Sequence, residues 1–143
     1  MKRLALLLLA APLAAGAAEF RSVQDAAAVL YDAPSRASTP LFVVQRNYPL
    51  EVIVNLEAWV KVRDAAGALT WIERKSLSDK RTLLVTGASA EARQRPEEAA
   101  PVAFSAAKDV TLDLVEVAPN GWLRVRHADG ATGFVRAAQV WGD

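Results

Sequence analysis

A twenty-residue segment, Trp59–Ser78, recurs 63 residues later as Trp122–Trp141, and this internal repeat limits the folds open to the chain. The copies read WVKVRDAAGALTWIERKSLS and WLRVRHADGATGFVRAAQVW and align without a gap. Six positions are identical and five more are similar in character. A repeat of this length indicates two copies of one small structural unit.

Each copy begins with a segment in which apolar and charged residues alternate. In Trp59–Arg63, Val60 and Val62 face one way and the remaining three residues face the other, which is the period of a half-buried strand. Asp64–Gly67 is predicted to be a hairpin turn, because its glycine can adopt a positive φ. A return strand and a single 3₁₀ turn follow, and Trp122–Val140 repeats the order.

The sequence ahead of each copy also predicts strands. Phe20–Val23 and Thr82–Val85 lie 62 residues apart, and each is followed by a further β-branched apolar run. The alanine-rich segments 24–30 and 87–92 lack a 3.6-residue apolar stripe, so we expect strand and loop there rather than helix. The sequence therefore predicts an all-β chain of two units, 19–79 and 80–143, joined by a very short linker.

The amino-terminal segment has the pattern of a secretory signal. Lys2 and Arg3 precede the apolar run Leu4–Ala15, and the small residues Ala15-Gly16-Ala17 follow as a cleavage site. The uncharged stretch is shorter than the ~20 residues that span a bilayer. We expect residues 1–18 to be a cleaved signal peptide, the protein to be periplasmic or secreted, and no transmembrane segment to follow.

The charge balance argues against a nucleic-acid-binding protein, and the lack of cysteine excludes a fold that is stabilised by disulfides. Removing Lys2 and Arg3 lowers the 17 basic residues to 15, against 16 acidic ones, so no global positive field is available to hold nucleic acid. The chain contains no cysteine, so an exported form has to be stabilised by its core without disulfides. The length after residue 18 fits one ordinary domain or two of about sixty residues.

Two motifs carry a family resemblance. Gly121-Trp122-Leu123-Arg124-Val125 is followed by Gly133-Phe134-Val135, and the first copy has the looser match Ala58-Trp59-Val60-Lys61-Val62 with Thr70-Trp71-Ile72. In order and spacing the chain resembles a tandem pair of bacterial SH3-like (SH3b) domains of exported proteobacterial proteins, over about residues 19–143. The resemblance implies two SH3-like small β-barrels after a signal peptide.

Leu30-Tyr31-Asp32 also resembles part of the ALYDY segment of eukaryotic SH3 domains, which bind proline-rich peptides between aromatic ridges. This resemblance implies that Tyr31 and Trp59 are groove residues. Most other groove positions are replaced, for example by Glu73 and Ser76, so we do not expect recognition of a polyproline helix.

The sequence offers little for catalysis or metal binding. His127, the single histidine, falls in a predicted hairpin turn, and the pair Glu97-Glu98 lies in a polar loop without an opposing acid. No nucleophile motif, metal-ligand cluster or phosphate-binding glycine loop is present. We therefore expect neither an enzyme nor a cofactor or metal site.

One pattern is common to both copies: an aromatic residue followed by two cations on one strand face. These faces consist of Trp59, Lys61 and Arg63 in the first copy and of Trp122, Arg124 and Arg126 in the second. They could be ligand ledges on which the indole stacks and the cations hold a carboxylate. They could instead be structural, with the cations lying over a tryptophan that covers the barrel's end. A third arrangement would bury one ledge against the other unit.

A charge cluster at the boundary between the units also has two interpretations. Arg74, Lys75, Lys80 and Arg81 are interleaved with acidic residues, either as a solvated surface between the units or as a small anion-binding patch.

These observations favour a non-enzymatic binding module for cell-wall (peptidoglycan) peptides or glycan. The alternative is an adaptor that docks on a periplasmic or envelope protein through edge strands and aromatic side chains. The candidate ligand-binding residues are Tyr31, Trp59, Lys61, Arg63, Trp71, Trp122, Arg124, Arg126 and Phe134.

Overall fold

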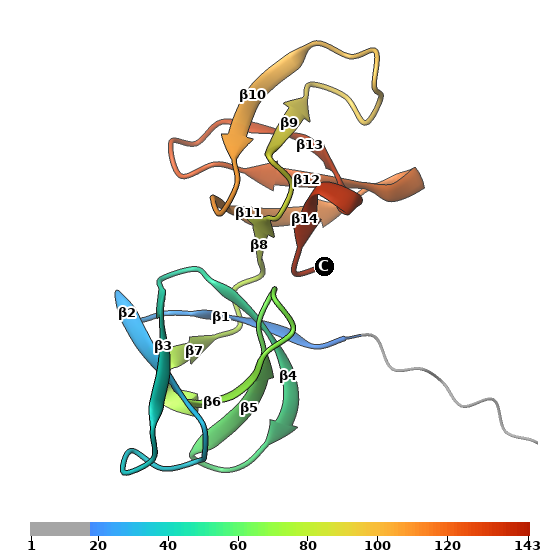
Figure 1. The fold of residues 1–143 in the computed structure, drawn as a ribbon. Coiled ribbons are helices and arrows are strands. Elements are labelled where there is room, and N and C mark those ends of the chain that lie inside the picture. The colour runs from blue at the N-terminus through green and yellow to red at the C-terminus, as the bar shows by residue number, and fades with distance from the viewer. Residues whose placement is uncertain (1–17) are drawn as a thin grey trace, which may run out of the picture.

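The computed structural model describes residues 18–143 and consists of two antiparallel seven-stranded sheets, each curled around its own core (Figure 1). The all-β expectation is confirmed. The expected signal peptide lies outside the described residues except for Ala18. None of the helices in this part of the chain is long and apolar enough to cross a membrane.

The first domain is formed by seven strands and one 3₁₀ turn. In sheet order the strands run β3-β2-β6-β5-β4-β1-β7. Their bounds are β1 Phe20–Val23, β2 Ala27–Tyr31, β3 Pro40–Gln45, β4 Pro49–Asn55, β5 Trp59–Arg63, β6 Leu69–Glu73 and β7 Leu77–Ser78, with the 3₁₀ turn η1 at Arg74–Ser76.

The second domain repeats this order as β10-β9-β13-β12-β11-β8-β14. Its strands are β8 Thr82–Val85, β9 Ser89–Arg93, β10 Val102–Ala107, β11 Thr111–Val117, β12 Trp122–Arg126, β13 Thr132–Arg136 and β14 Val140–Trp141. Its 3₁₀ turns are η2 Pro119–Gly121 and η3 Ala137–Gln139. Both alanine-rich segments form strands, as expected, because their alternate side chains are buried in the cores.

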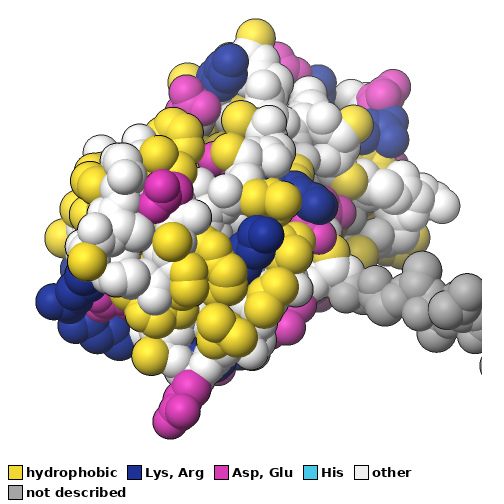
Figure 2. All heavy atoms as spheres, turned by 60° about the horizontal axis from the view of Figure 1, so that its bottom comes forward, with side chains coloured by type: hydrophobic (Ala, Val, Ile, Leu, Met, Phe, Trp, Pro, Cys, Tyr) yellow, Lys and Arg dark blue, Asp and Glu magenta, His cyan; other side chains and the backbone are white. Residues whose placement is uncertain are grey.

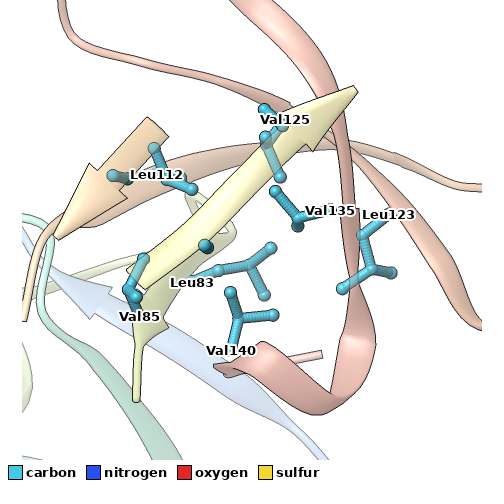
Figure 3. Packing of buried hydrophobic residues seen from close by; sticks show 10 residues of the cluster. Leu83, Val85, Leu112, Leu123, Val125, Val135 and Val140 are labelled. Atoms are coloured by element: carbon cyan, nitrogen blue, oxygen red, sulfur yellow. The ribbon is translucent and has the colours of Figure 1, made fainter. Parts of the chain in front are cut away.

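Each core forms from the inward residues of the alternating strands. Val60 and Val62 of β5 are fully buried, and so are Leu123 and Val125 of β12. Figure 3 shows the second core, in which side chains from β8, β11, β12, β13 and β14 converge. Since only the inward residues of β5 and β12 build the cores, the outward residues of these strands can be polar, charged or aromatic.

The hairpin turns have the backbone that their glycines predict. Gly67 has φ +90° and Gly130 has φ +92°, a left-handed conformation that residues with a Cβ rarely adopt. The predicted position of these two turns is confirmed.

The junction between the domains is packed by aromatic, cation–π and polar contacts. The rings of Phe20 and Trp141 meet edge to face with centroids 5.1 Å apart, and the Arg81 guanidinium lies 5.6 Å from the Phe20 centroid. Thr82 Oγ1 donates to Asn47 O at 2.6 Å, and Lys80 Nζ, which follows the boundary, lies 3.0 Å from Asp113 Oδ1 of its own domain. Within residues 18–143, none of the hydrogen bonds, ion pairs or aromatic contacts between the domains involves β5 or β12, so neither expected ledge forms part of this junction.

The close approach of β13 to β9 predicts a stability effect at Gly133. A Cβ on Gly133 would lie 2.8 Å from Ala92 Cβ and 3.1 Å from Arg93 O. We expect Gly133→Ala to lower the free energy of unfolding by about 1–3 kcal/mol in chemical denaturation. Gly87→Ala is the control, because its nearest neighbour would be 3.6 Å away. Equal stability of the two variants would contradict the described packing of β9 on β13.

Candidate functional site

The outer face of the first sheet carries a row of four side chains from four strands. Cross-strand pairing places Val54 of β4 opposite Lys61, Lys61 opposite Trp71 of β6, and Trp71 opposite Tyr31 of β2. Directly opposed residues project to the same side of a sheet, so these four form one surface, here called the central row. Three of the predicted site residues are thereby brought together.

Trp59 lies beside this row and extends it. Its ring meets that of Tyr31 edge to face, with centroids 5.6 Å apart and an interplanar angle of 81°. This arrangement is favoured by the ring quadrupoles and stabilises the position of the half-buried indole. The two residues that the eukaryotic resemblance places in a groove are therefore in direct contact.

A hollow of about 660 Å³, here called the Trp59 hollow, opens next to this indole. It is bounded by the loop between β2 and β3, the loop between β4 and β5, and η1. Its lining includes Pro34, Arg36, Glu57, Trp59, Glu73 and Lys75. Arginine and lysine side chains outnumber carboxylates in the full lining, because Arg74 also contributes. The hollow therefore combines an aromatic wall with a cationic rim.

An ion pair crosses the rim of the hollow. Arg36 donates to both carboxylate oxygens of Glu73, with Nη2 3.1 Å from Oε2, and Lys75 Nζ lies 3.3 Å from the same oxygen. These contacts, the hydrogen bond from Arg36 first, lower the pKa of Glu73 from 4.5 to about 2 despite the opposing effect of burial. Glu73 is therefore ionised at neutral pH and holds both cations at the rim.

Arg74 fixes the opposite wall of the hollow. Its Nε donates to Glu57 O at 2.6 Å, and its Nη2 donates to Leu56 O and Asn55 Oδ1. Since one guanidinium binds the end of β4 and two carbonyl groups of the loop that follows, Arg74 is a positioning residue for that loop.

The outward cations of β5 have different surroundings. Arg63 Nη1 lies 3.1 Å from Glu51 Oε2, and Glu51 is its cross-strand partner. Lys61 makes no ion pair with any residue in the described range 18–143, and it lies between Val54 and Trp71. Of these two cations, Lys61 is therefore the one whose charged group is available to a ligand.

In the second domain, the tryptophan that corresponds to Trp59 is covered by an arginine side chain. Trp122 is only 4% exposed, and the Arg136 guanidinium lies over its ring at 4.4 Å from the centroid. Arg136 in turn donates to Glu98. Arg136 occupies the place of Glu73 and Glu98 that of Arg36, so the ion pair is conserved in position with its charges reversed. Stacking of a ligand on Trp122 would require displacement of Arg136.

The row across the second sheet is also more polar. Glu116 lies opposite Arg124, Arg124 opposite Phe134, and Phe134 opposite Arg93. Arg124 and Arg126 are exposed and Phe134 is half-buried. The structure thus places these three predicted residues on one face without an open indole beside them.

His127 occupies the predicted hairpin turn. Its ring packs against Phe104 at 5.6 Å, and its Nδ1 lies 3.2 Å from Asp129 Oδ1. Residues 18–143 contain no group of three or more histidine, cysteine or acidic side chains placed to hold a metal ion.

A family model for the bacterial SH3 domain matches residues 24–79 and again residues 86–142. The chain belongs to the bacterial SH3 domain family. The two matches account for most of the chain, and each contains all strands of one sheet except the first, β1 or β8, so the tandem SH3 arrangement inferred from the repeat is confirmed. In the described range the chain consists of these two SH3 domains.

Solved structures that resemble this tandem SH3 chain include NlpC2 and NlpC1 from Trichomonas vaginalis and an NlpC/P60 family protein from Bacillus cereus ATCC 10987. Identities are 11%, 12% and 15%, with TM-scores of 0.41, 0.41 and 0.39. The matches cover 89%, 99% and 85% of this chain but 49%, 51% and 55% of the others. The chain thus spans about half the length of each. A search of curated proteins found no match.

Sequence reasoning missed several residues of the Trp59 hollow. Arg36 lies in a loop that was predicted only as polar, and nothing local pairs it with Glu73, which is 37 residues away. The boundary charge cluster separates in the structure, because Arg74 and Lys75 line the hollow while Lys80 and Arg81 lie at the domain junction. The repeat aligns Glu73 with Arg136, and this reversal of charge is the sequence signal that could have pointed to a difference between the two sites.

The ion pair across the rim predicts an acid-sensitive group. In the protein, the pKa of Glu73 should be about 2 in a carboxyl carbon NMR titration, and Arg36→Ala should raise it towards 4.5. Since the folded-state pKa lies below the unfolded one, the pair stabilises the fold above about pH 4.5, and this stabilisation disappears as the pH falls towards 2. Arg95→Ala, which removes an arginine from the corresponding loop of the second domain, should leave the titration of Glu73 unchanged.

Proposed function

We propose that this protein is an exported, non-enzymatic binding protein of the bacterial cell envelope whose first SH3 domain recognises peptide or glycan fragments of the cell wall. The observation that carries the proposal is the open indole of Trp59 at the wall of a hollow with a cationic rim. Membership of the bacterial SH3 family supports a binding role, and the signal-like sequence of residues 1–18 supports export.

The chemistry of the hollow suits a ligand with an apolar or sugar face and a carboxylate. The indole offers a flat surface for stacking, and the stem peptides of peptidoglycan offer carboxylates. Arg36 and Lys75 have side chains that are 67% and 69% exposed, so both can turn donors towards a ligand while Glu73 holds them in place. Charge-assisted hydrogen bonds of this kind contribute ~1.5–3 kcal/mol when they are shielded from water.

Lys61 extends the proposed site along the central row. Its cross-strand neighbours are Val54 and Trp71, and its side chain is available to a second carboxylate of a longer ligand. In this proposal Arg63 stabilises β4 through Glu51, and Trp122 is structural because Arg136 covers it. The first domain therefore binds, and the second supports it.

Co-sedimentation with purified peptidoglycan sacculi tests the proposal. We expect the protein without residues 1–18 to bind at low salt, and Trp59→Ala to weaken binding by about tenfold or more, equivalent to ~1.4 kcal/mol. Lys75→Ala should weaken binding and reduce its salt dependence. No retention of the parent protein on sacculi at low salt would rule the proposal out.

Matched controls separate loss of the site from loss of the fold. Lys108→Ala removes an exposed lysine of the second domain away from the Trp59 hollow and should bind like the parent. Trp59→Phe keeps an aromatic face and should restore part of the binding. If Lys108→Ala weakened binding as much as Lys75→Ala, the interaction would be a general charge effect.

A second candidate function, docking on an envelope protein, has one specific observation in its favour. Hydrophobic side chains gather on the end of the first domain that Figure 2 brings forward, with a basic side chain among them. In the first domain Val54, Leu56 and Leu69 are between 40% and 46% exposed. Apolar patches of this kind are typical of protein interaction sites.

Crosslinking in cells distinguishes this candidate from wall binding. A photo-crosslinking residue at position 69 should capture one defined envelope protein, and the same residue at position 117 of the second domain should not. Absence of a specific product at position 69, together with binding to sacculi, would leave wall recognition as the function.

A further inference from the structure

Strand β3 presents an unusual run of apolar side chains to solvent. Leu41, Phe42 and Val43 are consecutive and are 45%, 50% and 68% exposed. Successive side chains of a strand point to opposite faces, so both faces of β3 are exposed here. A surface strand normally has polar residues on at least one face.

The backbone of β3 is unpaired along one side. The strand is the last in its sheet, and among the described strands only β2 pairs with it. In Figure 1 the strand runs along the left-hand side of the first domain, and at its end the residues from Val43 to Arg46 share a hollow with Asp109 and Thr111 of the second domain. A free strand edge of this kind is a template for a further strand, and natural proteins commonly protect it with lysine, proline or a covering loop.

The corresponding strand of the second domain lacks this surface. In β10, Ala103 and Ser105 stand where β3 has Leu41 and Val43. Phe104, the counterpart of Phe42, is half-buried against the ring of His127. The fold by itself therefore does not require large apolar residues on this edge, and the first domain has a specific excess of them.

The charges around β3 favour a second copy of the same strand as the occupant. Residues 37–45 contain no charged side chain. If two copies align antiparallel about a two-fold axis that passes beside Val43 or Phe42, Arg46 of one molecule faces Pro40 or Ser38 of the other instead of a second Arg46. Self-pairing thus places no like charges opposite each other.

We propose that two molecules of this protein associate through antiparallel pairing of their β3 strands, which joins the two first domains into one continuous sheet. The contact uses the same surface on both molecules, and within residues 18–143 β3 is the one edge strand with consecutive large exposed apolar side chains, so the assembly closes as a two-fold dimer. A single six-residue strand pair is smaller than a standard interface, so the dimer is concentration-dependent. This inference is independent of the proposed ligand site.

Analytical ultracentrifugation over a concentration series up to about 1 mM tests the dimer. We expect the parent protein to move from monomer to dimer, and Val43→Lys to remain monomeric at all concentrations, because two lysines would then lie at the paired edge. Val117→Lys is the matched control, since Val117 is a 74% exposed valine of the second domain. It should dimerise like the parent, and circular dichroism should show both variants folded.

Hydrogen exchange locates the contact without assuming its register. Amide protection of residues 40–45 should rise with protein concentration, while that of residues 102–107 should not change. A parent that is monomeric throughout the series overturns the proposal, and this outcome includes the case in which a different protein covers β3. A dimer that survives Val43→Lys, or one without added protection of β3, also overturns it.

Discussion

The two-residue alternation of β5 and β12 is the constraint on which the rest of the structure depends. It buries Val60 and Val62 in one core and Leu123 and Val125 in the other. The antiparallel register then carries the alternation to the neighbouring strands, so that Lys61 and Arg63 each have a defined neighbour on both β4 and β6, and Trp59 has one on β6. Because a slip of one residue would exchange the core for the surface, packing of the core also fixes the geometry of the candidate site.

The two copies retain this framework and differ on the surface that it supports. In the first domain, Glu73 draws Arg36 and Lys75 to the rim and leaves the indole of Trp59 facing the hollow. In the second, the reversed pair places a guanidinium over Trp122 and covers it. The ion pair occupies one position in both copies. Where the strand residue is Glu73, the indole faces the hollow, and where it is Arg136, the guanidinium covers the indole. A contrast also holds at the sheet edges, where β3 exposes three consecutive large apolar side chains and β10 exposes only Val102.

The sequence predicted the strands, turns and repeat well, because these depend on local patterns. Alternation, β-branched runs and the turn glycines each act within a few residues. The candidate site was predicted only in part: the pattern identified the outward face of β5 and the aromatic pair Tyr31 and Trp59, but it missed Arg36. It also treated both tryptophans alike, since the residues that distinguish them lie on other strands and loops.

The sequence by itself determined that this chain is a duplicated all-β protein of the bacterial SH3 family, because periodicity and motif spacing are written along the chain. The tertiary structure alone decided which copy presents an open site. That outcome depends on contacts between residues about 37 positions apart, such as Arg36 with Glu73 and Glu98 with Arg136. Such contacts form only when the loop between the second and third strands of each domain folds over the end of its sheet, and no local pattern encodes that closure.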